Sequence, residues 1–433
     1  MQVRICPRRL SLTTALVVSV CSLAAVADET PSDAKPVPRT RGEMKAALEA
    51  LKQRQPRIPF PSPDAVPTPA SGWKANNGTM RRYYLPAKWY AADFAPDPAM
   101  KLDNTFKVRL FWIVSRANNC QYCLGHQEHK LLVAGMQENE IAALDSRWDE
   151  FPRSEQAAFG FTRKLTLTPH LINADDVAGL RSFYSNDETI ELIYVASFYN
   201  SVNRWTDGLG IPQDEQFANK PLHLATTTAT EYVSNPTIVV EGKDAARPPL
   251  EPEADVRRQL ELARTRNPRV TIPSLESARE TLTPALTEQG VASWMRVLSL
   301  FPKTGTAQVA ALQSIRDEGQ LPKELKAKLA AVSARNNRAW ASLGWARQRM
   351  QSCGIDAAQF ESIESVSAEL PLKDQVALSF ARKLTIQPKG IGDRDILRLR
   401  VHFDDRETAE IVYVVCAANF FDRFTEALNL PLD

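Results

Sequence analysis

Two cysteines three residues apart are the residues best suited to chemistry in this sequence. Cys120 and Cys123 stand in the stretch CQYCLGHQEHKLLVAG, directly after Asn118 and Asn119. Asparagine is a common helix N-cap, so we expect an amphipathic helix to begin here with both sulfurs in its first turn and on one face. The partial positive charge of a helix N-terminus favours the nucleophilic thiolate, and paired cysteines can close a disulfide. The spacing therefore predicts a redox-active dithiol.

Histidines follow the cysteines at the same interval, which raises the alternative of a metal site. Cys120, Cys123, His126 and His129 are each three residues apart. Steps of three along a helix drift through roughly 180° over four positions, so four ligands converge on one tetrahedral zinc only where the helix breaks. A structural disulfide or a pair of buried thiols is a further alternative. We favour the redox dithiol, with no metal and no cofactor.

The sequence contains a long internal repeat. Residues 161–214 return as residues 380–433 without a gap, at an offset of 219, with 21 of 54 positions identical. A second match, LEALKQRQPRIPFPS against LELARTRNPRVTIPS, places the starts of the two copies near Leu48 and Leu260. A repeat of this size indicates two domains of one fold.

The remaining segments complete a predicted domain plan. Arginines, an apolar run and Ala25-Val26-Ala27 are typical of a cleaved signal peptide and an exported protein, periplasmic or extracellular, with an uncleaved membrane anchor as the alternative. Proline-rich stretches are typical of linkers. We therefore predict a signal peptide at 1–27, a flexible N-terminal segment at 28–46, a first domain at 47–214, a linker at 215–258 and a second domain at 259–433.

Both copies have helical patterns. Apolar residues are dense after Asp187 and after Arg406, as expected of a buried helix of about 15 residues. Short amphipathic helices are expected at 139–144, 155–165 and 175–183. Alternating strand patterns are nearly absent. We predict an all-α fold, a bundle of short helices built twice.

The cysteine stretch and its surroundings resemble the carboxymuconolactone decarboxylase superfamily, specifically its alkyl hydroperoxidase D-like, peroxidase-related branch. The resemblance rests on CQYCLGHQEHKLLVAG together with FTRKLTLTPHLINADDVAGLR, ETIELIYV and NRWTDGLGIPQD. It implies an all-α, oligomer-forming fold, present here as a tandem repeat whose second copy is degenerate. It also implies that Cys123 attacks a peroxide and becomes a sulfenic acid, and that Cys120 resolves this intermediate as a disulfide.

The sequence departs from the family's proton relay at two positions. The family's histidine, four residues after the second cysteine, is Gln127 here, and its glutamate, twelve residues before the first cysteine, is Val108. His126, three residues after Cys123, is on the right face of a helix to accept its proton. The candidate catalytic residues are therefore Cys120, Cys123 and His126, with Gln127 and His129 as supporting residues.

The second copy lacks the dithiol. At the offset of 219, the four positions Cys120, Cys123, His126 and His129 correspond to Ala339, Ser342, Trp345 and Gln348. Trp340 and Trp345 are expected to fill the emptied site with apolar volume. The second copy is then expected to supply an interface like that between subunits of an oligomer.

The charge balance of the chain excludes one class of protein. The chain has 53 basic and 51 acidic side chains, and this balance excludes a strongly basic nucleic-acid binder.

We expect an exported thiol-dependent peroxidase or disulfide oxidoreductase, with a peroxide as substrate and an unidentified thiol or disulfide as reductant. Its chains, each like a dimer in itself, are expected to form a homo-oligomer. The alternatives are a decarboxylase-like enzyme without thiol chemistry and a non-catalytic scaffold with a structural CxxC.

Overall fold

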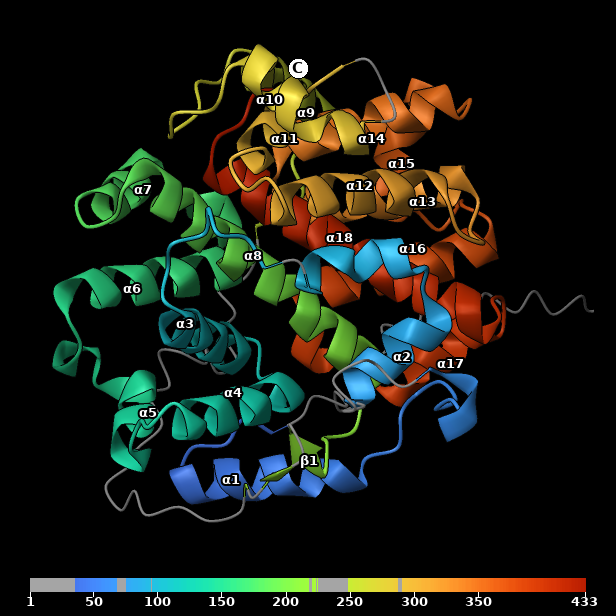
Figure 1. Ribbon diagram of the computed structural model, residues 1–433. Helices are drawn as coiled ribbons and strands as arrows, with labels where there is room; N and C mark the ends of the chain where they lie inside the picture. Colours follow the sequence, from blue (N-terminus) through green and yellow to red (C-terminus); the bar gives the residue numbers. More distant parts are fainter. Residues whose placement is uncertain are drawn as a thin grey trace, which may run out of the picture. The chain divides into compact units, whose positions relative to one another are not determined.

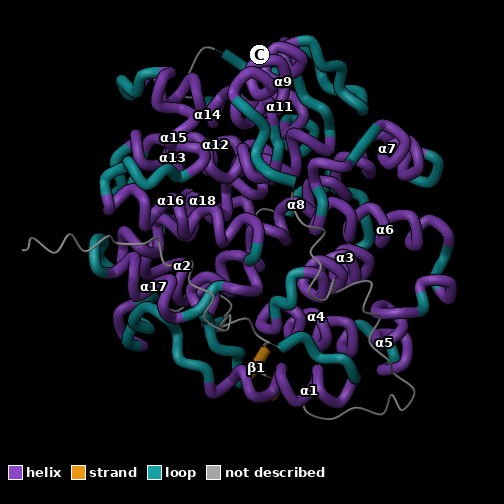
Figure 2. The backbone as a smooth tube through the Cα atoms, turned by 180° about the vertical axis from the view of Figure 1, so that it is seen from behind, coloured by secondary structure: helices purple, strands orange, loops and turns teal. Residues whose placement is uncertain are grey.

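The protein is almost entirely helical over the residues that its computed structural model describes, which are 36–67, 75–94, 96–217, 220–222, 224, 248–286 and 290–433 (Figures 1 and 2). This confirms the all-α prediction. Residues 33–433 form one compact unit, and the predicted signal peptide at 1–27 lies outside the described residues. Within them, the strands are the antiparallel pair β1 (Gln216–Phe217) and β2 (Lys220–Pro221). None of the described helices combines the length and hydropathy that a membrane crossing requires.

The first half of the chain carries the helices at all three predicted amphipathic stretches, as α5, α6 and α7. Its α-helices are α1 (Arg41–Ala50), α2 (Asn76–Tyr84), α3 (Asn104–Ala117), α4 (Gln121–Val133), α5 (Glu138–Ser146), α6 (Arg153–Leu167), α7 (Ala174–Arg181) and α8 (Asn186–Leu209). Short 3₁₀ turns connect them at η1 (Leu51–Gln53), η2 (Pro63–Ala65), η3 (Ala87–Phe94), η4 (Trp148–Glu150) and η5 (Pro169–Leu171).

The elements of the second half follow one another in an order similar to that of the first half. Its α-helices are α9 (Glu253–Arg264), α10 (Leu275–Leu282), α11 (Ser293–Leu298), α12 (Thr304–Asp317), α13 (Lys323–Asn337), α14 (Trp340–Ser352), α15 (Phe360–Ser365), α16 (Leu372–Ile386), α17 (Asp393–Arg400) and α18 (Asp405–Ala427). Its 3₁₀ turns are η6 (Thr283–Ala285), η7 (Ala357–Gln359) and η8 (Pro388–Gly390). Helices α14, α16 and α17 begin and end 219 positions after α4, α6 and α7. The duplication of the chain itself stays a prediction.

Helices α8 and α18 pack against each other and join the two halves (Figure 1). The guanidinium of Arg204 in α8 donates to Thr385 O in the second half at 3.0 Å. Arg423 in α18 donates to Thr166 O in the first half at 3.3 Å. Both guanidinium groups are buried, and each also bonds the asparagine one turn earlier in its own helix. The two contacts are reciprocal, so each half supplies a hydrogen-bond acceptor to an arginine of the other.

Close approach of the two long helices depends on ring packing and on one small residue. The rings of Tyr194 in α8 and Phe420 in α18 lie edge to face, with centroids 5.5 Å apart. Gly208 faces Val412, and a Cβ atom added at Gly208 would lie 2.9 Å from Val412 Cγ1. That separation is shorter than carbon atoms tolerate, so a larger residue would push the helices apart.

An extended arm in each half caps the long helix of that half and reaches into the other half. The backbone N–H of Arg57 donates to the last residue of α8 at 2.9 Å, and its Nη2 donates to Ile391 O at 2.8 Å. The backbone N–H of Arg269 donates to the residue after α18 at 3.0 Å, and its Nη2 donates to Ile172 O at 3.2 Å. These bonds satisfy carbonyl groups that a helix C-terminus leaves open.

Two segments predicted to be loose contain regular structure. Helix α1 begins at Arg41, inside the predicted flexible segment 28–46, and Thr40 caps it in a capping box with Glu43. The predicted linker 215–258 contains β1, β2 and the first half of α9. Composition suggested loose chain at both places, but Arg41 and Lys45 of α1 are buried in ion pairs.

Those ion pairs fasten α1 to α4. Glu128 is fully buried, and it accepts from Arg41 Nη1 at 2.7 Å and Trp112 Nε1 at 2.6 Å. Lys45 Nζ lies 3.0 Å from the same carboxylate. Burial raises the pKa of Glu128, but the charges of Arg41 and Lys45 outweigh it and bring the pKa down to about 2. The carboxylate is therefore stable only while these two cations accompany it.

We predict that Glu128 makes the protein acid-sensitive. A carboxyl whose pKa is lower in the folded chain stabilises it above the ordinary pKa and loses that contribution as pH falls toward 2. With about 1.4 kcal/mol for each pKa unit, the contribution is about 3 kcal/mol. Glu128→Gln should lower the free energy of unfolding in urea at pH 7 and flatten its decline between pH 5 and pH 3. Glu150→Gln, at an exposed pair with Arg147, serves as the control. Equal effects of the two substitutions would contradict the prediction.

Candidate functional site

The junction between α3 and α4 sets the position of both cysteines. Asn118 ends α3, Asn119 has a left-handed backbone with φ of 52°, and Cys120 is the N-cap of α4. The predicted N-cap at Asn118-Asn119 is therefore wrong by one residue, because α3 runs almost directly into α4. The backbone N–H of Cys120 donates to Ser115 O at 2.8 Å, which closes the turn. Cys123 follows in the first turn of α4, as predicted.

One hydroxyl group lies against both sulfurs. Thr206 Oγ1 of α8 is 3.1 Å from Cys120 Sγ and 3.3 Å from Cys123 Sγ. The same hydroxyl is within hydrogen-bond distance of Val202 O and Asn203 O in the preceding turn of α8. When its proton is directed to these carbonyls, Thr206 accepts from the thiols, and by turning the O–H it can donate to a thiolate. The arrangement suits either protonation state of the sulfurs.

A layer of amides holds α3 and α8 together beside the sulfurs. Asn118 Nδ2 donates to Asn200 Oδ1 at 3.1 Å and to Asn203 Oδ1 at 3.0 Å. Asn203 Nδ2 donates in turn to Ser115 Oγ at 3.2 Å. These side chains are buried, and a buried polar network with its members paired fixes a single arrangement. The network therefore fixes the position of Thr206 relative to the cysteines.

Two cations act on the cysteines from different elements. Arg54, in the arm after α1, lies close enough to Cys120 to interact with its charge, and Lys130 of α4 interacts in the same way with Cys123. Burial lowers the pKa of Lys130, and a negative charge on Cys123 acts in the opposite direction. Burial and the charge of Arg57 lower the pKa of Arg54. Two positively charged side chains therefore lie near the pair of sulfurs.

The imidazole ring of His126 contacts the carboxylate of Asp214 and the backbone carbonyl of Tyr122. Its Nε2 is 3.0 Å from Asp214 Oδ2, a distance that suits an ion pair although the ring is not aligned for a hydrogen bond. Its Nδ1 is 3.1 Å from Tyr122 O, and the hydroxyl of Tyr122 donates to Asp214 Oδ2 at 2.8 Å. The structure therefore brings Cys120 and Cys123 together at Thr206 and places His126 at a neighbouring cluster.

The supporting candidates are Gln127, which bonds the backbone of Cys123, and His129, which packs against Phe217; neither of these contacts involves a sulfur atom. Gln127 Nε2 donates to Cys123 O at 3.0 Å, and its Oε1 is buried with no hydrogen-bond partner in the described chain. The ring of His129 lies 5.3 Å from that of Phe217 in β1, and burial, followed by the charge of His126, lowers its pKa. Nowhere in the described residues do three or more Cys, His, Asp or Glu side chains cluster as metal ligands would.

The corresponding place in the second half has a similar frame with other side chains. Arg338 repeats the φ of 52° found at Asn119, and Ser342 Oγ lies 2.8 Å from Thr425 Oγ1. Trp345 Nε1 donates to Asp433 O at 3.0 Å. The expectation that Trp340 and Trp345 fill the emptied site is wrong, because a cavity of about 630 Å³ lies there and Trp345 forms part of its wall.

The comparisons with known proteins find little. No protein-family model matches the chain, and no curated protein matches it. A crystal structure of apo debrominase Bmp8 matches with 12% identity and a TM-score of 0.30, over 42% of this chain and 90% of that chain. A cysteine-to-alanine variant of debrominase Bmp8, in complex with 2,3,4-tribromopyrrole, matches with 14% identity and a TM-score of 0.31, over 42% and 89%. Similarity this low carries no argument, so membership of the carboxymuconolactone decarboxylase superfamily stays a prediction from the sequence.

Proposed function

We propose that the protein is an exported thiol-dependent peroxidase or disulfide oxidoreductase that uses Cys120 and Cys123. The proposal rests on one contact at the N-terminus of α4. The hydroxyl oxygen of Thr206 lies 3.1 Å from Cys120 Sγ and 3.3 Å from Cys123 Sγ. A pair of thiols that only filled space would need no shared polar partner. Here the partner can stabilise a thiolate on either sulfur, which is what a dithiol that alternates between two states requires.

Positive charge lies close to the sulfurs. It comes from the open N–H groups at the start of α4 and from Arg54 and Lys130. His126 pairs with Asp214 in the described chain. We therefore propose that thiolate formation depends on Thr206, Arg54 and Lys130 more than on His126, which positions Tyr122 and the first turn of α4.

The proposed reaction has two steps. In the first, the Cys123 thiol gives up its proton and the thiolate attacks the terminal oxygen of a peroxide ROOH. The O–O bond breaks, Cys123 becomes a sulfenic acid, and the leaving alkoxide takes up that proton and departs as the alcohol ROH. In the second, the Cys120 thiol gives up its proton and the thiolate attacks the Cys123 sulfur; the S–O bond breaks, the disulfide forms, and the leaving hydroxide takes up the proton to become water. An external dithiol then returns both sulfurs to the thiol form and is itself oxidised to a disulfide.

Burial of the sulfurs bears on which oxidant reaches them. Cys120 is 0% exposed and Cys123 is 2% exposed, so neither sulfur can touch a folded protein's disulfide in this arrangement. We propose that hydrogen peroxide, or a peroxide with a small organic group, reaches them through local motions of the chain. The geometry therefore favours peroxide as the oxidant over direct exchange with protein disulfides.

The two cysteines should behave differently in a single turnover. Cys123→Ser is expected to abolish oxidation by hydrogen peroxide, because the attacking sulfur is absent. Cys120→Ser should still consume one equivalent and leave a sulfenic acid at Cys123, detected by a sulfenic-acid trap and mass spectrometry. Cys353→Ser, which removes a thiol outside the site, is the control and should react like the parent protein.

Other outcomes of the same assay would favour the alternatives. Equal behaviour of Cys120→Ser and Cys123→Ser, or unchanged peroxide consumption in both, would contradict the assigned roles. If the parent protein consumes no peroxide while both substitutions lower its stability, the CxxC is structural.

The hydroxyl of Thr206 is expected to control thiolate reactivity. Thr206→Val preserves side-chain shape and removes the group that can donate to a thiolate, so iodoacetamide should alkylate Cys123 about tenfold more slowly at pH 7, as expected for a hydrogen bond to a charged group worth about 1.5 kcal/mol. Thr425→Val removes the corresponding hydroxyl of the second half and should leave the rate unchanged. His126→Asn should slow alkylation less than Thr206→Val. A Thr206→Val rate equal to that of the parent protein would refute the role of the hydroxyl.

A further inference from the structure

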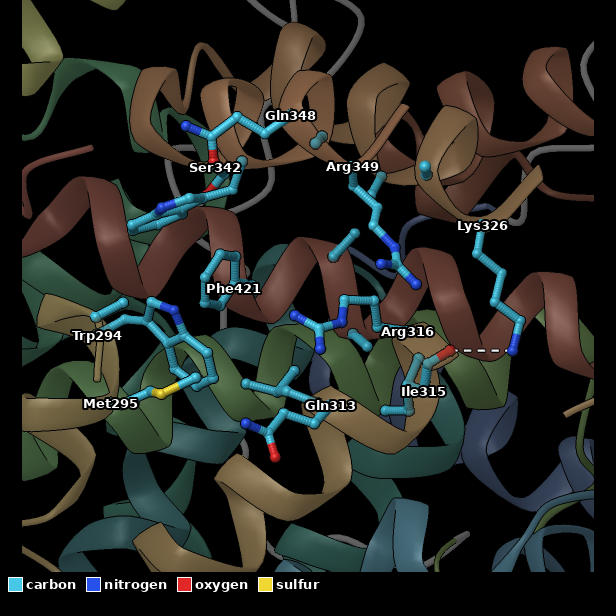
Figure 3. Close-up of a pocket in the computed structure, with 18 of the residues that line it drawn as sticks. Trp294, Met295, Gln313, Ile315, Arg316, Lys326, Ser342, Gln348, Arg349 and Phe421 are labelled. Atoms are coloured by element: carbon cyan, nitrogen blue, oxygen red, sulfur yellow. Dashed lines mark hydrogen bonds between the residues drawn. The ribbon is translucent and has the colours of Figure 1, made fainter. Parts of the chain in front are cut away.

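A cavity of about 630 Å³ opens in the second half, where the first half has its dithiol (Figure 3). Residues from α11, α12, α13, α14 and α18 line it, including Ser342 and Asp422. Ligand sites in proteins have volumes of roughly 300–1,000 Å³, so the space is that of a small organic molecule.

The cavity owes its volume to alanines. Ala330, Ala417 and Ala418 line it, and the positions 219 residues earlier carry Phe111, Phe198 and Tyr199. In the first half, the rings of Phe111 and Tyr199 stack with centroids 3.9 Å apart and fill the space between α3 and α8. The exchange of three aromatic rings for three methyl groups leaves room between α13 and α18.

Aromatic side chains form one end of the cavity. The ring of Phe421 lies 5.3 Å from that of Trp294, edge to face, and 5.4 Å from that of Trp345. Figure 3 shows Trp294, Met295 and Phe421 grouped on one side of the cavity. Such a wall offers flat faces and edges, and it favours a flat ring over a flexible aliphatic chain.

Polar groups line the space beside this wall. The guanidinium groups of Arg316 and Arg349 both donate to the carboxylate of Asp317. In Figure 3 their side chains occupy the part of the cavity between the aromatic residues and Lys326. Arg349 Nε is buried without a hydrogen-bond partner in the described residues. Gln313 is only 3% exposed, and both atoms of its amide lack a partner within the described chain.

A carboxyl group, that of Asp422, also lines the cavity. Asp422 accepts from Ser333 Oγ at 2.7 Å and from Asn337 Nδ2 at 2.9 Å. Burial raises the pKa of Asp422 to about 7 against the effect of these hydrogen bonds. Among the described residues of the cavity wall, Arg349 Nε and the amide of Gln313 are hydrogen-bond donors that remain open to a carboxylate.

We propose that this cavity is a binding site for an aryl carboxylate, a flat aromatic ring that bears one acidic group. The ring packs against Trp294 and Phe421, and the carboxylate accepts from Arg349 and from the amide of Gln313. The proposal concerns a site without cysteines, and it holds or fails independently of the function proposed for Cys120 and Cys123.

The test is calorimetric titration of the full chain with naphthylacetate, compared with its neutral analogue naphthylacetamide and with the aliphatic acid decanoate. The acid should bind with one site per chain and at least tenfold more tightly than either analogue. Equal binding of the amide would overturn the role of the cations, and tighter binding of decanoate would overturn the aromatic class. Absence of binding by naphthylacetate would overturn the proposal altogether.

Two substitutions locate the binding in the cavity. Arg349→Gln should weaken naphthylacetate about tenfold and leave naphthylacetamide unchanged, while Lys130→Gln, at the corresponding position of the first half, should change neither. Ala418→Tyr restores the first half's side chain and should abolish binding of all three probes. If Arg349→Gln and Ala418→Tyr both remain folded by circular dichroism and still bind like the parent protein, the site lies elsewhere and the proposal is wrong.

Discussion

The reciprocal packing of α8 against α18 is the contact on which the rest of the structure depends. Arg204 and Arg423 each donate across it to a backbone carbonyl of the other half. Both guanidinium groups are buried, and these carbonyl groups accept one of the N–H donors of each. Helix α8 places Thr206 beside the cysteines of the first half, and α18 places Asp422 in the wall of the cavity in the second half. Neither site could keep its geometry if the helices moved apart.

The two halves have a similar frame that is filled differently. In the first half the rings of Phe111 and Tyr199 stack between α3 and α8, and Cys120 and Cys123 are buried. Around Ser342, alanines leave open volume in place of those rings. A reactive dithiol needs fixed neighbours, whereas a ring-sized ligand needs space. The close packing of the first half therefore suits the function proposed for the cysteines, and the open volume of the second half suits the ligand proposed for the cavity.

Local patterns predicted the helices and the position of both cysteines at the start of one helix, while contacts between distant segments could not be read from them. Periodicity placed α5, α6 and α7 correctly, but α8 has 24 residues where about 15 were expected, because Asn200, Asn203 and Arg204 interrupt its apolar pattern although all three are buried. Thr206 stands far from Cys120 in sequence, and nothing local marks it as a partner. Alignment of the two halves did contain a signal for the cavity, since three aromatic positions become alanine, but only the packing of α13 beside α18 gives those alanines a common space.

The reciprocal arginine contacts also have a consequence for the rate of folding. Arg423 and its acceptor at Thr166 are 257 positions apart, and Arg204 and Thr385 are 181 apart. Folding slows as native contacts connect more distant parts of a chain, because long loops must close before those contacts form. During synthesis the first half is completed well before α18 exists. The face of α8 that carries Tyr194 and Arg204 is therefore not packed against α18 during that time. This interval is the stage at which the nascent chain is most exposed to misassembly, and protection by a chaperone would matter most there.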